Sequence, residues 1–396
     1  MKKNWLGVSA AFAIILFSIF AAQCQTRTGI RGKIEMAPGW KSVLYLIEPV
    51  NFSDISASYS GRLVDSTIIL PDGSFVFQLP ESGQIKLYQL CIQKTGSRFF
   101  NKLEDTPEER NFFPIVMQPG TPIQFYSKAD QFLSQARIEQ PSPDHRALMQ
   151  LRDVWMAAQT NFQETVRNID DADENAILAH ETALERYRAS LMAFADTTQS
   201  FYAALVAIRW VSPENDYERI PEFLASQCRR WQAIYPGEPY TLHLCQMAHP
   251  AQLPVMVGDV MPNVELPMMD GKTDSLYHLL GPKLTLIDLW ASWCAPCRKE
   301  NREVLVPLYQ ETKDKGFQIV GYALDSNEKG WKAAIAKDQA LWPQSSHLQG
   351  DVSPFLDLLR IRTIPANFLL DSQGRVVAKN LHGEELSALV RAYLEK

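Results

Sequence analysis

Cys294 and Cys297 are the residues of this chain whose type and spacing are most suited to chemistry. They lie three positions apart in the segment Trp-Cys-Ala-Pro-Cys. A thiolate is the nucleophile in disulfide exchange, and two thiols one helical turn apart can close into a disulfide. The spacing therefore predicts a dithiol in which Cys294 attacks a partner disulfide and Cys297 resolves the mixed disulfide.

The residues around this pair predict how it is held. An apolar run from Leu284 to Trp290 predicts a strand buried on both faces, and apolar residues between Val304 and Leu308 predict a following helix. Cys294 would then stand at the helix N-terminus, where free N–H groups and the helix dipole favour a thiolate. Pro296 suits the first turn, because its missing N–H costs nothing there.

The longer pattern Trp-x-x-Trp-Cys-x-Pro-Cys-x-x-Glu, from Trp290 to Glu300, resembles the active site of the thioredoxin superfamily, in particular its secreted TlpA/ResA branch of thiol-disulfide oxidoreductases. Gly258 to Pro262 and Asp270 to Lys272 resemble the hairpin that opens the fold in that branch. Arg362 to Gly374 resembles its cis-proline strand and the hairpin that follows. The resemblance covers about Val257 to Lys396 and implies an α/β thioredoxin-like fold there.

The resemblance also implies further site residues. In the family the cis-proline lies beside the disulfide and helps to bind the partner, so Pro365, Ile364 and Trp293 are expected to form the substrate-binding groove. Asp288 matches by position the buried acid that relays protons to the resolving cysteine. Glu300 matches the acid near the active site in the ResA-like branch. The chain has both acids, which leaves open which one acts as the base.

Each acid also has a purely structural interpretation. Asp288 could be a polar residue at the end of a strand, although a charge inside an apolar run is costly unless it has a partner. Glu300 could be a solvated acid in the first turn of a helix.

Other chemistry for the cysteine pair has less support. A zinc site would need two more ligands, and the chain has no second C-x-x-C and no ligand-like spacing at His278 or His347. A structural disulfide stays open, although a C-x-x-C disulfide at a helix start is reducible. A peroxiredoxin would need a proline and a threonine where Ile287 and Ala291 stand. We expect no metal and no other cofactor.

Length and composition limit the remaining choices. The 396 residues predict two or three domains, and 46% hydrophobic with 21% charged residues is ordinary for globular protein. A net charge of -6 supplies no basic patch, so no nucleic acid is expected as a partner. Six cysteines are too few for a disulfide scaffold in a chain of this length.

The N-terminus indicates export. Lys2 and Lys3 precede an apolar stretch from Trp5 to Ala22. Residues 1–24 are therefore predicted to be a signal peptide, either cleaved or of the lipoprotein kind with Cys24 lipidated. An uncleaved membrane anchor is the third alternative. All three place the rest of the chain in the periplasm or cell envelope, and the last two would tether it to a membrane through its N-terminus.

Residues 25–135 predict a small antiparallel β-sandwich. Phe75 and Phe77 alternate with polar neighbours, as expected of a half-buried strand, and Met117 to Phe125 predicts a last hairpin. The region resembles the β-rich module of unknown function that often precedes secreted TlpA-like thioredoxins. Partner binding and a spacer role both stay open for it.

Residues 136–250 change to a helical period and predict a bundle between the sandwich and the thioredoxin-like domain, residues 251–396. Asp144, after Pro143, is predicted to cap the first helix. A third helix is predicted from Phe201 to Val211. The second helix is predicted to bury one apolar face, made of Ile177, Leu184, Tyr187, Leu191 and Phe194.

Besides Cys24, three cysteines lie outside the motif. Cys91 falls in a predicted strand and is expected to be buried as an apolar residue. Cys228 and Cys245 could form a disulfide in an oxidising compartment, but an even number of cysteines does not show connectivity, so free thiols are the prediction.

These patterns together predict an exported thiol-disulfide oxidoreductase. As in most of the TlpA/ResA branch, it would reduce disulfides of envelope proteins and receive electrons from a membrane thiol carrier. Its substrate is left open between apocytochrome c and misoxidised secreted proteins. An oxidant or isomerase is one alternative, and a binding or assembly module whose cysteines only sense redox state is another.

Overall fold

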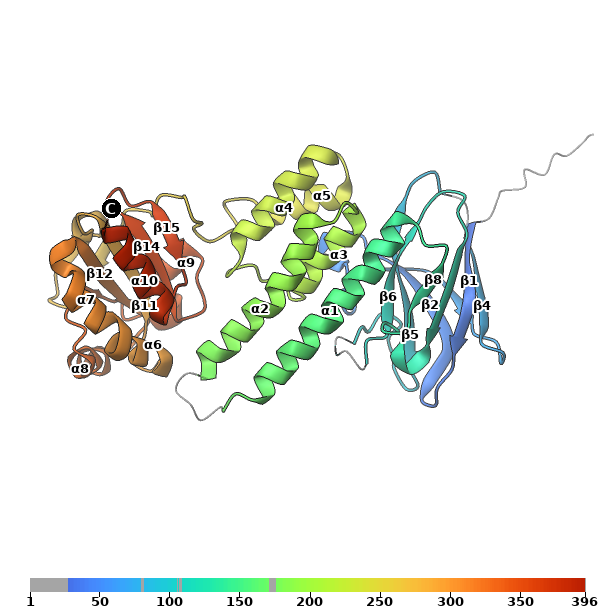
Figure 1. Cartoon of the computed structure of the whole chain (residues 1–396), viewed down its shortest axis with the longest axis horizontal. Coiled ribbons are helices and arrows are strands. Elements are labelled where there is room, and N and C mark those ends of the chain that lie inside the picture. The colour runs from blue at the N-terminus through green and yellow to red at the C-terminus, as the bar shows by residue number, and fades with distance from the viewer. Residues whose placement is uncertain (1–27, 80–81, 105, 107–108, 171–175, 396) are drawn as a thin grey trace, which may run out of the picture.

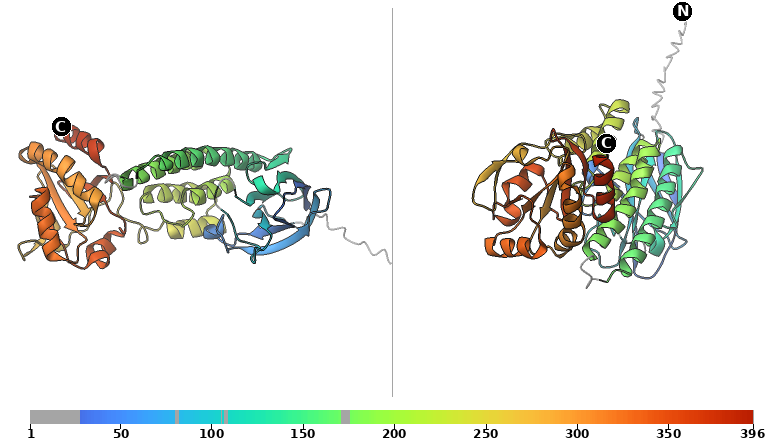
Figure 2. Two further views of the ribbon diagram at one scale, coloured as in Figure 1. Left: turned by 90° about the horizontal axis from the view of Figure 1, so that it is seen from below. Right: turned by 60° about the vertical axis from the view of Figure 1, so that its left-hand side comes forward.

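The computed structural model describes residues 28–79, 82–104, 106, 109–170 and 176–395. Figures 1 and 2 show three parts in a row: paired β-sheets, a layer of helices, and an α/β part that carries the C-terminus. This order confirms the predicted fold class. The predicted signal peptide, residues 1–24, lies outside the described residues. Within the described ranges, no helix combines the length and apolar character needed to cross a membrane.

The first part consists of two four-stranded sheets with the strand orders β4-β1-β7-β8 and β3-β2-β5-β6. The sheets pack face to face, and the rings of Phe113 and Phe125, one from each sheet, have centroids 5.7 Å apart. The strands are β1 (Thr28–Glu35), β2 (Trp40–Glu48), β3 (Arg62–Ile68), β4 (Ser74–Leu79), β5 (Lys86–Lys94), β6 (Phe112–Met117), β7 (Ile123–Lys128) and β8 (Arg137–Glu139).

The sandwich is mixed rather than wholly antiparallel, which corrects the prediction. β1 pairs with β4 antiparallel but with β7 parallel. The predicted hairpin from Met117 to Phe125 is also wrong, since β6 and β7 belong to different sheets. Every residue of β6 is buried, whereas β7 alternates between buried and half-buried residues. A strand buried on both faces needs cover from a second layer, and β6 finds it under the helices.

The second part contains α1 (Pro143–Arg167), α2 (Ala176–Thr197), α3 (Phe201–Val211), α4 (Pro221–Ile234) and α5 (Pro239–Met247). α3 has the predicted bounds. Ser142 caps α1, because its Oγ accepts a hydrogen bond from His145 N at 3.2 Å. The prediction of Asp144 as the cap is wrong, since Pro143 takes the first helical position and the cap is the residue before it. Asp144 instead accepts a hydrogen bond from Ser200 Oγ at 2.6 Å.

The apolar face predicted for α2 is confirmed with one exception. Tyr187, Leu191 and Phe194 are buried, and Leu184 packs against the same core. Ile177 is 52% exposed, because the buried stripe enters the first turn through Ala176.

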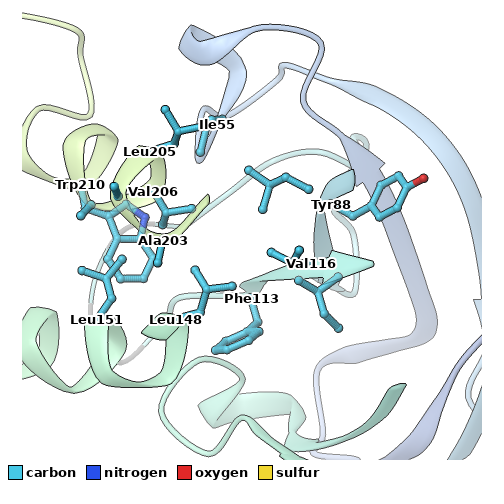
Figure 3. Packing of buried hydrophobic residues seen from close by; sticks show 14 of the residues in the cluster. Ile55, Tyr88, Phe113, Val116, Leu148, Leu151, Ala203, Leu205, Val206 and Trp210 are labelled. Carbon is cyan, nitrogen blue, oxygen red and sulfur yellow. The ribbon is translucent and has the colours of Figure 1, made fainter. Parts of the chain in front are cut away.

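One apolar core joins the sheets to the helices. Figure 3 shows Leu148 of α1 between Phe113 of β6 and Trp210 of α3. The Arg110 side chain is buried against two indole rings of this core, with its Cζ 3.9 Å from the ring centroid of Trp155 and 4.3 Å from that of Trp210. The β-rich and helical regions therefore pack as one unit.

The third part is built on a five-stranded sheet of order β13-β12-β11-β14-β15. β11 is central, buried at all seven positions as predicted, parallel to β12 and antiparallel to β14. The strands of this part are β9 (Glu265–Pro267), β10 (Thr273–Ser275), β11 (Leu284–Trp290), β12 (Phe317–Ala323), β13 (Gln344–Ser345), β14 (Ala366–Asp371) and β15 (Val376–Lys379). Its helices are α6 (Ala295–Glu300), α7 (Val306–Thr312), α8 (Glu328–Asp338), α9 (Pro354–Leu359) and α10 (Gly383–Leu394), and a π-helical turn (Asn301–Leu305) separates α6 from α7.

The cysteines outside the motif differ from the prediction at one pair. Cys228 and Cys245 form a disulfide, because the turn between α4 and α5 brings their Cα atoms to 4.9 Å, within the range that a disulfide spans. Sequence spacing does not reveal this approach. Cys91 is free and fully buried in β5, as predicted.

Replacing Arg110 tests how much the shared core depends on its stacked guanidinium group. We expect Arg110→Lys to lower the free energy of unfolding by about 2 kcal/mol, because a desolvated guanidinium stacked on two indoles has no equivalent in an ammonium group. Urea titration followed by tryptophan fluorescence measures this. Arg137→Lys is the matched control, since Arg137 stacks on Tyr126 at 4.1 Å but is exposed. Equal losses in the two variants would contradict the expectation.

Candidate active site

The two motif cysteines form a disulfide where β11 ends and α6 begins. Cys294 is the N-cap residue of α6, and its Sγ accepts a hydrogen bond from Cys297 N at 3.3 Å. This is the strand–turn–helix arrangement that the sequence predicts. Cys294 is 5% and Cys297 3% exposed, so both cysteines are almost wholly covered by the surrounding fold.

Polar side chains from two other elements fix this turn. Asp325, just after β12, accepts hydrogen bonds from both the backbone N–H, at 2.9 Å, and the hydroxyl of Ser292. Arg298 of α6 donates to the buried carboxylate of Asp338 in α8 and to Ser292 O at 3.1 Å. The sequence patterns described above do not include these residues. The position of Asp325 near the motif could have been predicted, because the parallel strands β11 and β12 end at the same edge of the sheet.

Asp288 lies within β11 and is 5% exposed. Desolvation by burial, together with the nearby charge of Glu300, raises the pKa of Asp288 to about 8, although His382 acts in the opposite direction. Asp288 therefore holds a proton at neutral pH and can exchange it close to physiological pH.

Glu300 is buried as well, at 6% exposed. Its carboxylate accepts hydrogen bonds from His382 Nδ1 at 2.8 Å and from Gly383 N at 3.1 Å, both at the start of α10. Glu300 is thus not a solvated helix acid, because α10 covers it. Burial lowers the pKa of His382, but the hydrogen bond to Glu300 and the charges of Glu300, Glu181 and Asp288 outweigh this effect and raise it. The sequence analysis did not single out His382.

Two of the residues expected to bind substrate lie next to the cysteines, one in the chain and one in the apolar core. Trp293 is 62% exposed directly before the buried Cys294. Ile364 packs against the apolar cluster that contains both cysteines, and the Ile364–Pro365 peptide bond is cis.

The segment that ends in this cis-proline is held by the helical region. Glu218, between α3 and α4, accepts hydrogen bonds from the backbone N–H groups of Arg362 and Thr363 at 3.0 and 3.1 Å. Arg219 donates to the carbonyl oxygens of Thr363 at 3.3 Å and Pro365 at 2.9 Å. No local sequence pattern reveals a polar contact between segments so far apart in the chain.

No group of three or more His, Cys, Asp and Glu side chains in the described part of the chain is arranged to hold a metal ion. His278 pairs with Asp274 at 3.1 Å, and His347 contacts the hydroxyl of Tyr322 at 2.6 Å.

Comparisons with known proteins point to the same domain. Residues 257–379 match the model of the AhpC/TSA family. A thiol-disulfide oxidoreductase ResA of Bacillus cereus is 28% identical over 142 residues, covering 36% of this chain and 79% of ResA. The thiol:disulfide interchange protein DsbE of Pseudomonas fluorescens biotype C is 29% identical over 157 residues, covering 37% of this chain and 83% of DsbE.

A solved structure also matches. The thioredoxin domain of a thiol-disulfide oxidoreductase from Bacteroides vulgatus is 34% identical and is covered to 99%, which corresponds to 35% of this chain, with a TM-score of 0.33. The family match spans Cys294, Cys297 and Pro365. Residues 257–379 thus form a thioredoxin-like domain that matches the AhpC/TSA family, and the protein is a thiol-disulfide oxidoreductase of the ResA/DsbE type.

Proposed function

We propose that this protein is an exported reductase that reduces disulfides of envelope proteins through Cys294 and Cys297. The observation that carries the proposal is the Cys294–Cys297 disulfide at the start of α6. The buried carboxyl group of Asp288, on the preceding strand β11, retains its proton at neutral pH. Such a cysteine pair can accept and donate two electrons without any other cofactor.

The reaction begins from the reduced dithiol. The Cys294 thiolate, favoured by the Cys297 N–H that points to its Sγ, attacks one sulfur of a partner disulfide. A mixed disulfide forms, the partner S–S bond breaks, and the other partner sulfur leaves as a thiolate that takes up a proton. Cys297 then loses its proton to a carboxylate, and its thiolate attacks Cys294 Sγ. The partner leaves as a thiolate and takes up a proton from water. Two electrons have moved to the partner, and Cys294 and Cys297 are left as a disulfide.

Asp288 and Glu300 divide the proton chemistry in this proposal. Glu300 lies one helical turn after Cys297 on α6, so both side chains project on the same face of the helix. Asp288 on β11 retains its own proton at neutral pH, because burial and the charge of Glu300 disfavour a second carboxylate there, so Glu300 is the carboxylate that receives the Cys297 proton.

Trp293, Ile364 and Pro365 form the partner groove in this proposal. The exposed indole of Trp293 supplies apolar contact area beside Cys294. The backbone before Pro365 is fixed by Glu218 and Arg219, so the helical region sets the shape of one side of the groove.

Two observations support an envelope location with a membrane thiol carrier as electron donor. The apolar N-terminal segment predicts export, and lipidation of Cys24 would tether the protein. The Cys228–Cys245 disulfide suits an oxidising compartment. A reductase working there needs electrons from across the membrane, because its surroundings would otherwise keep Cys294 and Cys297 oxidised.

Single cysteine variants test the roles of the two thiols. Cys297→Ser should accumulate a mixed disulfide through Cys294, because no thiol remains to resolve it, whereas Cys294→Ser should trap nothing and lose all reductase activity. Insulin reduction and non-reducing electrophoresis measure both. Cys91→Ala is the control, since Cys91 is buried far from the motif in the sequence. Trapping through Cys294→Ser instead would reverse the assignment.

The redox states of the two disulfides in cells distinguish a reductase from an oxidant. We expect Cys228–Cys245 to be oxidised and Cys294–Cys297 to be largely reduced in the same molecules. The reduction potential of the Cys294–Cys297 pair should be about -270 mV. Acid quenching, differential alkylation and mass spectrometry measure the first, and equilibration with dithiothreitol the second. An oxidised Cys294–Cys297 pair in cells, with a reduction potential of about -120 mV, would identify an oxidant.

Asp288→Asn tests the buried acid. Folded Asp288 keeps its proton up to a pH of about 8, whereas the unfolded chain releases it near the ordinary value of 3.8, so wild-type stability falls as pH rises through this window. Asparagine does not ionise. The stability gained by Asp288→Asn should therefore grow from about pH 5 to about pH 8, by about 1.4 kcal/mol per pH unit at most.

Urea unfolding of the oxidised protein at several pH values measures this gain. Asp351→Asn, at an exposed position, is the control and should show no pH-dependent difference from wild type. A stability difference for Asp288→Asn that is independent of pH would contradict the raised pKa.

A further inference from the structure

His382 connects the buried carboxyl groups to a cavity at the junction of two regions. Its Nδ1 lies 2.8 Å from Glu300 Oε2, and its side chain is 21% exposed, compared with 6% for Glu300. The imidazole ring also lines a cavity of about 440 Å³. The His382 side chain thus lies between Glu300 and a cavity that reaches the surface.

The cavity lies between α2 of the helical region and the α/β part. Glu181, Leu184 and Met192 line it from α2, and Asn380 and His382 line it from the opposite side. Its walls combine apolar surface with carboxylates, so it offers both room for a small molecule and acceptors for a proton.

Several hydrogen bonds fix the backbone that carries His382. Asn367 of β14 accepts from Leu381 N at 3.1 Å and donates to Leu381 O at 2.6 Å. Arg219 of the helical region donates to Asn380 Oδ1 at 3.0 Å. Together with the Gly383 N–H that binds Glu300, these contacts leave His382 little freedom to move away from the carboxylate.

We propose that His382 is a positioning residue that acts through Glu300, passing the proton released by Cys297 to solvent in this cavity. The inference rests on the proposed dithiol reaction. In that reaction Cys297 transfers its proton to the carboxylate, forms the bond to Cys294 Sγ and displaces the partner sulfur with its electron pair. Protonation of Glu300 removes the negative charge that stabilises the imidazolium, which then releases its own proton to water on the side of α2, and the partner thiolate takes up a proton elsewhere.

The charges around His382 favour this passage. The titratable and charged groups around it are Glu300 of α6, Asp288 of β11, which keeps its proton at neutral pH, Glu181, Glu185 and Arg188 of α2, Asp216 and Arg219 between α3 and α4, and Glu384 and Glu385 of its own helix α10. The carboxylates, with Glu300 in direct contact, outweigh burial and the two guanidinium groups, so the imidazolium form is stabilised. Histidine suits such an exchange, because the ordinary pKa of its side chain is close to physiological pH.

Stopped-flow reaction of the reduced, full-length protein with an aromatic disulfide that releases a coloured thiolate separates the two chemical steps. The first equivalent of thiolate reports attack by Cys294, and the second reports resolution by Cys297. We expect His382→Ala to slow the second step about 100-fold at neutral pH and to leave the first unchanged. Added imidazole should restore much of the second step, because the cavity next to the truncated side chain has room for it.

His382→Asn provides the second test. Its amide retains a donor where Nδ1 stands, so it keeps the hydrogen bond to Glu300 but does not take up a proton. We expect the second step to be slow in this variant as well. His278→Asn, the same change at an exposed histidine, is the matched control and should behave as wild type.

Three outcomes would overturn the inference: wild-type rates for both steps in His382→Asn, no imidazole effect on a folded and slow His382→Ala, or an equal slowing of both steps. Circular dichroism establishes that each variant is folded, and if His382→Ala does not fold, His382→Asn decides alone. Failure of the wild-type protein to release any thiolate would instead refute the proposed dithiol reaction.

Discussion

Two carboxyl groups buried beside a disulfide are the constraint on which much of this structure depends. Asp288 is 5% and Glu300 6% exposed, and burying two acids so close together is costly unless protons or donors compensate. Asp288 meets this cost by retaining its proton. Glu300 meets it with donors from His382 and Gly383. The start of α10 must therefore lie over α6, since it supplies both of those donors.

The helical region takes part in holding this arrangement. Arg219 binds Asn380, two residues before His382, as well as the carbonyl oxygen of Pro365. Lys379 pairs with Glu222 of α4 at 2.9 Å. Arg219, in the loop between α3 and α4, thus contacts both the cis-proline segment and the segment that leads to His382. A change in how the helices sit would alter the groove and the proton environment together.

The β-rich region is joined to the helices by packing and by buried polar contacts. Arg110 lies against the rings of Trp155 and Trp210, and the buried guanidinium of Arg209 donates to Ile55 O at 3.1 Å and Ser212 O at 2.6 Å. The sheets and helices share one core, so they meet the α/β part as one unit. This arrangement is compatible with a role in partner binding and with a role as a rigid support.

The sequence alone determined the features that depend on local pattern. The apolar run of β11, the C-x-x-C at the following turn and the helical periods are properties of consecutive residues, so the α/β part and the position of Cys294 at a helix start were predictable. Tertiary structure decided what depends on distant contacts. Neither the parallel pairing of β1 with β7 nor the Cys228–Cys245 bond has a local signal. The burial of Glu300 by α10 is equally absent from its neighbours in the chain, because 82 residues separate it from His382.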